Sequence, residues 1–186
     1  MTAAAANGLR LYVGELRQLF DSLDPAPFRE RDLDPKAAEY IVDSAREAPV
    51  GAALALQVQL GREPATQATV AMLSDAVREY FAGRAAAKRR ELGQLFRTGR
   101  LSLAIGLAFL AGAIALAQWL GSLIAHEGYA WLVSESLIIG GWVALWRPME
   151  IFLYDWWPIR AELRLFERLS TMSVSLHGAA AAGTAA

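Results

Sequence analysis

The feature that most constrains this chain of 186 residues is an uncharged apolar run, LSLAIGLAFLAGAIALAQWLGSLI, from Leu101 to Ile124. As an α-helix, the run would be about 36 Å long, which exceeds the ~30 Å hydrocarbon core of a bilayer. Buried core helices of soluble proteins seldom continue this far without a charged residue. The run therefore predicts a transmembrane helix over residues 101–124.

The second apolar segment, residues 131–154, is interrupted by charged residues. Its uninterrupted apolar part, LIIGGWVALW, has ten residues, which is too few to span a bilayer. A second span must therefore include Glu135 near one end and Arg147 and Glu150 near the other. Because the connection between the spans is short, the predicted fold class is an α-helical membrane protein with a two-helix transmembrane hairpin and a small N-terminal cytoplasmic α+β domain.

The distribution of basic residues around the spans predicts their orientation. Residues 84–100, expected to form a basic juxtamembrane helix, carry six Lys or Arg residues, whereas the connection between the spans has none. Positive charge collects on the cytoplasmic side, so both termini are expected in the cytoplasm. Aromatic residues then mark the two membrane interfaces, with Trp119 and Trp131 outside and Tyr154, Trp156 and Trp157 inside.

Arg147 and Glu150 lie three residues apart, which places them on one helix face within pairing distance. Pro148 between them lacks an amide proton, so a kink or break is expected over residues 146–148. Two structures fit this pattern: a kinked span that continues to Tyr154, or a span that ends near Arg147 and is followed by a helix along the inner leaflet. Because ionisable groups at membrane depth are costly, the functional candidates are Arg147, Glu150, Glu135 and Pro148.

Small residues recur in both spans at spacings that let helix backbones approach closely in lipid. An alanine-rich composition would also produce this pattern, and the spacing does not distinguish packing within the hairpin from packing between subunits. The candidate packing positions are Ala104, Ala108, Gly112, Gly140, Gly141 and Ala144.

The soluble part is predicted over residues 8–83, with disordered tails at 1–7 and 177–186 and a cytoplasmic interfacial helix at 155–176. Apolar spacing predicts a helix over residues 9–23, although LRLYV is also compatible with a strand. Asp34 and Pro35 mark the start of a helix that ends near Glu47. The alternating segment LALQVQL predicts a strand over residues 54–60, which needs a partner from residues 10–13 or from another subunit.

Catalytic residue types are sparse. The chain has no cysteine, two histidines far apart in the sequence, and no phosphate-binding or nucleophile motif. Its net charge of −1 argues against nucleic-acid binding. We therefore predict no catalytic, metal or cofactor-binding residue and no enzymatic activity.

The segments GGWVALWRPMEIFLYDWWPIRAELRLFERL and FRERDLDPKAAEYIVDSAREAP resemble a family of small bacterial membrane proteins with no assigned activity, over residues 9–169. The resemblance implies two spans in the bacterial inner membrane and implies no mechanism. The predicted function is a self-associating membrane anchor or assembly subunit whose cytoplasmic domain engages a protein partner. The alternative is a small oligomeric channel or transport component with Arg147, Glu150 and Glu135 along its path.

Overall fold

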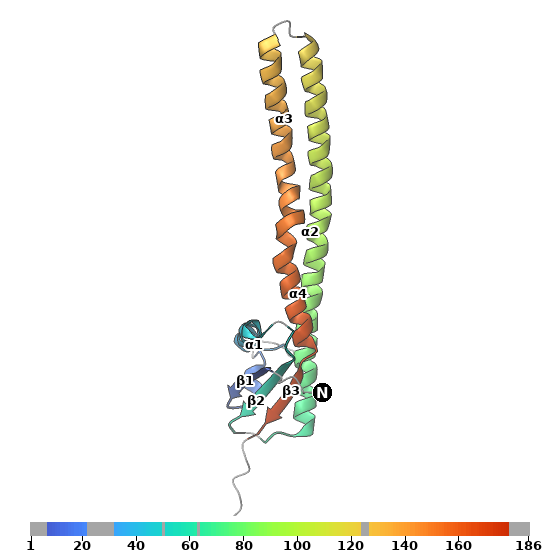
Figure 1. The fold of residues 1–186 in the computed structure, drawn as a ribbon. Helices are drawn as coiled ribbons and strands as arrows, with labels where there is room; N and C mark the ends of the chain where they lie inside the picture. The colour runs from blue at the N-terminus through green and yellow to red at the C-terminus, as the bar shows by residue number, and fades with distance from the viewer. Residues whose placement is uncertain (1–6, 22–31, 50, 63, 124–126, 179–186) are drawn as a thin grey trace, which may run out of the picture. The chain divides into compact units, whose positions relative to one another are not determined.

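The computed structural model describes residues 7–21, 32–49, 51–62, 64–123 and 127–178. The chain is mostly helical and divides into two compact units (Figure 1). The first, here called the sheet unit, comprises Met1–Ala87 and Glu162–Ala186. The second, the hairpin unit, is Lys88–Ala161. The predicted domain over 8–83 is thus incomplete, because it omits the C-terminal segment that returns to the sheet.

Three parallel strands form the sheet in the order β1-β2-β3. β1 (Asn7–Val13) pairs along its length with β2 (Leu54–Leu60), which pairs on its other side with β3 (Ser173–His177). Crossovers between parallel strands are nearly always right-handed, so this order places both crossovers on the same face of the sheet. Among the described residues, helices therefore cover only one face of the sheet.

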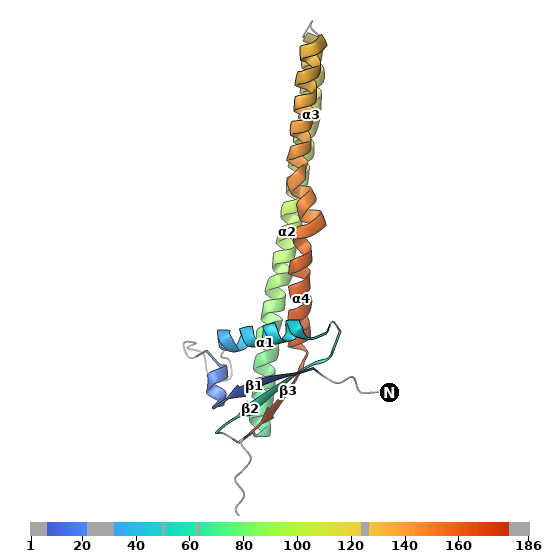
Figure 2. The same cartoon turned by 60° about the vertical axis from the view of Figure 1, so that its left-hand side comes forward.

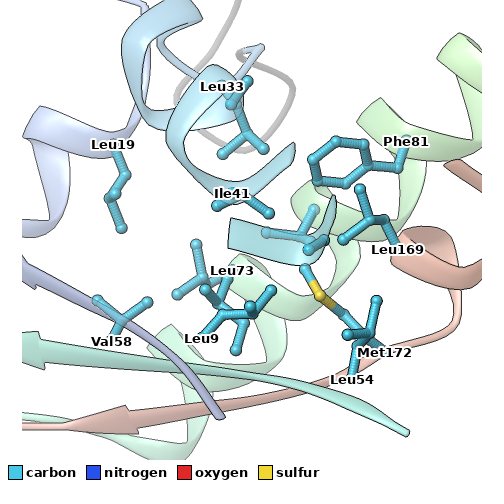
Figure 3. Close-up of a cluster of buried hydrophobic side chains, with 14 of the residues drawn as sticks. Leu9, Leu19, Leu33, Ile41, Leu54, Val58, Leu73, Phe81, Leu169 and Met172 are labelled. Atoms are coloured by element: carbon cyan, nitrogen blue, oxygen red, sulfur yellow. The ribbon is translucent and has the colours of Figure 1, made fainter. Parts of the chain in front are cut away.

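The covered face packs into one hydrophobic core with three helices: α1 (Pro35–Glu47), the first part of α2 (Gln67–Leu123) and the end of α4 (Trp156–Ser170). Apolar residues alternate along β2, as expected for a strand with one buried face. Figure 3 shows side chains from these elements meeting above the sheet, among them Leu9, Ile41, Leu54, Val58, Leu73, Phe81, Leu169 and Met172.

The structure confirms the predicted helix over residues 35–47 and the strand over 54–60. The Asp34 carboxylate accepts hydrogen bonds from the amides of Lys36 and Ala37, so it caps α1 as expected. The helix predicted over 9–23 is wrong for the described residues 9–21, and the alternative of a strand at LRLYV is confirmed. Residues 22 and 23 lie outside the described part of the chain. Residues 7–13 form β1, followed by a short 3-10 helix at Leu16–Leu19, because pairing with β2 outweighs a weak helical pattern. β2 thus has both its strand partners within the chain.

The interfacial helix predicted over 155–176 is also wrong at its C-terminal end. Helix α4 ends at Ser170, and Ser173–His177 form β3. The apolar face of α4, with Leu163, Phe166 and Leu169, is buried in the core of the sheet unit and does not face lipid. Two residues predicted in the disordered tails belong to strands: Asn7 begins β1 and His177 ends β3. Residues 1–6 and 179–186 lie outside the described part of the chain.

Replacement of Leu169 by Ala tests this correction. Leu169 is fully buried, so its truncation should lower the free energy of unfolding of the sheet unit by about 2–5 kcal/mol. The exposed neighbour Arg164 provides the control, since its replacement by Ala should change stability by only about 0.5 kcal/mol. Amide hydrogen exchange in β2 of the full chain measures both effects. Equal protection in the two variants would contradict the burial of α4 in this core.

In the hairpin unit, α2 runs antiparallel to α3 (Glu127–Glu150), and the two helices lie side by side in both views (Figures 1 and 2). Gly99 faces Ile151 and Phe152, Gly106 faces Ala144 and Leu145, and Gly141 faces Leu110. Gly99 and Gly106 on α2 are seven residues apart, and the residues that they contact, Ile151 and Ala144, are also seven residues apart in the opposite direction. This spacing is typical of helices that pack with a small left-handed crossing angle.

Pro148 does not break α3, so of the predicted kink or break over residues 146–148 the break is wrong, and the kink stays a prediction. The helix continues to Glu150 and then passes through a π-helical turn, Ile151–Asp155, into α4. Pro148 is buried and cannot donate to the carbonyl of Ala144 one turn earlier. That carbonyl lies close to Gly106, where a Cβ atom would approach its oxygen to 3.1 Å. Glycine thus permits a close backbone contact that accommodates the carbonyl freed by the proline.

The candidate packing residues divide between two surfaces. Gly141 and Ala144 lie in the contact between α2 and α3. The remaining four are exposed, and the two glycines among them have no neighbour that a Cβ atom would meet within 4 Å: Ala104, Ala108, Gly112 and Gly140. Two of the six positions therefore serve packing within the hairpin.

Paired glycine substitutions test the hairpin contact. Gly106→Ala should lower the melting temperature, because the new methyl group would meet Leu145 at 2.9 Å and the Ala144 carbonyl at 3.1 Å. Gly140→Ala meets no atom and should raise helix stability by about 0.5–1 kcal/mol through reduced backbone entropy. Thermal unfolding of both full-length variants in the same detergent, followed by helical circular dichroism, provides the comparison. A melting temperature raised in both would contradict the Gly106 contact.

Candidate functional site

An ion cluster forms around Arg147 at the end of α3. Its Nη1 atom lies 3.1 Å from Oε2 of Glu150 and 3.3 Å from Oδ2 of Asp155. The other carboxylate oxygen of Glu150 accepts a hydrogen bond of 3.0 Å from the indole Nε1 of Trp146. The side chains of Arg147, Glu150 and Asp155 are 65%, 41% and 33% exposed, so the cluster lies on the surface of the hairpin unit. The predicted pairing of Arg147 with Glu150 is confirmed.

The π-helical turn explains how Asp155 reaches this cluster. In a regular α-helix, a residue eight positions after Arg147 lies roughly 80° around the axis from it. A π turn takes up about one extra residue, which brings Asp155 to within roughly 20° of the Arg147 face. Sequence spacing does not predict Asp155 as a partner, because in a regular helix a carboxylate eight residues after an arginine lies on another face. Pro148 shortly before it was the available signal of an irregular helix.

A groove runs along the hairpin surface beside the cluster. Its volume is about 340 Å³, and it lies between α2 and α3 with Arg147 at one end. Apart from Arg147, only the hydroxyl of Ser102 contributes a polar side chain to the lining. The lining residues are Ser102, Ile105, Gly106, Phe109, Ala144, Arg147 and Pro148.

The register of α2 against α3 places charged and aromatic residues at matched levels. Continued along the helices, it sets Arg100 opposite Glu150 and Trp119 opposite Trp131. About 28 Å of helix separates these two levels. Both tryptophans are exposed, as are Tyr154 and Trp157 beyond the other end. Trp156 is half-buried, and its indole donates to the Phe152 carbonyl at 2.9 Å.

Glu135 does not join the ion cluster. It is exposed on α3, twelve residues before Arg147, or about 18 Å along the helix. Its side chain makes no hydrogen bond or ion pair with another described residue. Glu135 therefore lies outside the ion cluster, and an oligomeric path that includes Arg147, Glu150 and Glu135 stays a prediction.

Within the described ranges, two helices are long and apolar enough to cross a membrane. The searched residues contain no group of three or more His, Cys, Asp or Glu side chains that could hold a metal ion. His177 ends β3 and is exposed, and His126 lies outside the described residues. The ion cluster and its groove are therefore the candidate site.

Comparison of the chain with protein-family models, curated proteins and solved structures gave no match. The resemblance to two-span bacterial membrane proteins stays a prediction. The function must therefore be inferred from the geometry of the chain itself.

Charge removal tests the cluster. Arg147→Gln should destabilise the hairpin unit more than Glu150→Gln, because it leaves two carboxylates without their cation, whereas Glu150→Gln leaves the Arg147 and Asp155 pair intact. The difference should be about 1 kcal/mol or less, since exposed ion pairs contribute little. Thermal unfolding in detergent measures it. A larger loss in Glu150→Gln would contradict the central role assigned to Arg147.

Proposed function

We propose that the protein is a self-associating membrane anchor that presents the sheet unit to a protein partner in the cytoplasm. The observation that carries this proposal is the apolar exterior of the hairpin unit, where large side chains that a soluble protein buries are exposed on both helices. They include Leu101, Ile105, Phe109, Leu116, Ile139, Trp142, Val143 and Leu153. An apolar surface of this kind matches a lipid or protein environment.

The levels of the charged and aromatic residues support a bilayer. The distance of about 28 Å between the Arg100 and Glu150 level and the tryptophan level is close to the ~30 Å of a hydrocarbon core. The ion cluster would then lie at the inner edge of the core, with Tyr154 and Trp157 among the headgroups. In this placement Arg147 is paired and can extend toward the headgroups, while Glu135 lies inside the core about 6 Å from the Trp131 level.

The sheet supports an even number of crossings. β2 precedes α2 and β3 follows α4, and the two strands are hydrogen-bonded neighbours in one sheet. The segments before and after the hairpin must therefore lie on the same side of any membrane that it crosses. The excess of basic residues in 84–100 favours the cytoplasmic side.

The uncovered face of the sheet is the surface proposed for the partner. Parallel sheets are usually covered on both faces, whereas this face carries polar side chains in register across the strands. Arg10 is aligned with Gln57 and Ser175, and Tyr12 is aligned with Gln59 and His177. Tyr12 is 74% exposed, and this face carries no carboxylate in the three strands. A partner segment with hydrogen-bond acceptors or acidic side chains suits it best.

Self-association is assigned to the outer face of α2. Ala104, Ala108 and Gly112 lie on the side of α2 opposite its contact with α3, where their small side chains would let another helix approach closely. The channel alternative has less support. Glycines close the contact between α2 and α3, and Glu135 lies about 18 Å from the ion cluster along the helix.

Bulky substitutions on α2 test the proposal. The wild-type chain should fractionate with membranes and form oligomers in mild detergent. Ala108→Leu should shift the oligomer toward monomer by about tenfold in dissociation constant, or about 1.4 kcal/mol, because the larger side chain holds the two helix backbones apart. Ile114→Phe adds bulk to an exposed position on another face of α2 and should leave the oligomer intact. A soluble chain, or a strict wild-type monomer, would contradict the proposed function.

A further inference from the structure

We propose that the groove between α2 and α3 binds one phospholipid whose headgroup carries a primary ammonium, as in phosphatidylethanolamine. The acyl chain would occupy the apolar groove, and the headgroup would lie on the ion cluster. This inference rests on the proposed function in one respect, namely that the hairpin lies in a bilayer.

The groove has the form that an acyl chain requires. Its volume of about 340 Å³ is within the ~300–1,000 Å³ range of ligand sites, and its lining is almost entirely apolar. From Arg147, it extends along α2 from Ser102 to Phe109, that is, from the ion cluster toward the tryptophan level. A lipid that entered it with its headgroup at Arg147 would therefore have the orientation of the inner leaflet.

The charges of the cluster select the headgroup. One guanidinium faces two carboxylates, which gives the cluster a formal charge of −1. Of the three guanidinium nitrogens of Arg147, only Nη1 contacts another described residue, so Nη2 and Nε can donate to a lipid phosphate. The carboxylates of Glu150 and Asp155 can accept hydrogen bonds from a primary ammonium next to that phosphate. The cluster thus complements a headgroup that carries a negative and a positive charge side by side.

Other common headgroups fit this arrangement less well. A glycerol headgroup supplies the phosphate but no cation, so the carboxylates would repel it. A trimethylammonium headgroup supplies the cation but no N–H donor, so it forms no hydrogen bond with Glu150 or Asp155. Discrimination of about threefold to tenfold against both is expected, because the net contribution of an ordinary hydrogen bond is on that scale.

The test uses the purified full-length chain in detergent, incubated with equal amounts of phosphatidylethanolamine, phosphatidylglycerol and phosphatidylcholine with identical acyl chains. Native mass spectrometry then measures which lipid remains bound. The wild type should retain phosphatidylethanolamine preferentially, by about threefold to tenfold. Ser102→Phe, which fills the groove without altering the ion cluster, should abolish retention. Ser136→Phe makes the same change at an exposed position of α3 outside the groove and should retain the lipid.

Charge variants test the headgroup assignment independently of the groove. Glu150→Gln combined with Asp155→Asn leaves Arg147 as the only charge of the cluster, so the preference should reverse toward phosphatidylglycerol. Arg147→Gln removes the phosphate contact and should lower retention of all three lipids. Each variant must keep the helical circular dichroism of the wild type and stay folded at the temperature of the assay, which separates loss of the site from loss of the fold.

Three results would overturn the inference: equal retention of the three headgroups, equal loss in Ser102→Phe and Ser136→Phe, or a disulfide-linked dimer of Ser102→Cys in membranes. The last result would mean that a second copy of the chain occupies the groove. Failure of the proposed function is distinguishable, because the chain would then not fractionate with membranes. A membrane-embedded oligomer without lipid selectivity would contradict this inference alone.

Discussion

The pairing of β2 with β3 is the constraint on which the other features depend. Parallel strands all begin at the same end of the sheet, and the connection between two of them is usually a single helix. Here the connection contains α2, α3 and α4, so the chain must reverse direction before β3 can form. The antiparallel contact of α2 with α3 provides this reversal. The sheet therefore depends on the hairpin, because β3 can pair with β2 only after α3 and α4 have brought the chain back.

The hairpin contact depends on backbone chemistry more than on large side chains. In lipid, apolar side chains gain little by leaving their surroundings, so close packing has to hold helices together. Gly106 and Gly141 permit this approach, and Pro148 frees the Ala144 carbonyl that lies near Gly106. A proline that would destabilise an isolated helix is accommodated because the neighbouring helix offers space for that carbonyl. Pro148 is thus a packing residue in this fold.

The ion cluster shows how much of a site sequence spacing can predict. The i,i+3 rule identified Arg147 and Glu150, because both belong to one regular helix. It could not identify Asp155, whose position depends on the π-helical turn, nor exclude Glu135, whose distance from the cluster depends on helix continuity. The position of the ion cluster at the end of an apolar groove also depends on which faces of α2 and α3 meet. That is a property of two segments far apart in the sequence.

The sequence by itself determined the apolar spans, the capped helix α1 and the strand β2, because each carries its own local signal: an uncharged run, an Asp-Pro start or strict alternation. Only the tertiary structure decided that Asn7–Val13 is a strand, that Ser173–His177 completes the sheet, and that Leu163, Phe166 and Leu169 face a protein core. An apolar helical stripe has the same sequence pattern whether it contacts lipid or protein. A short strand is stable only beside a partner, and for β3 that partner, β2, lies more than a hundred residues earlier in the chain.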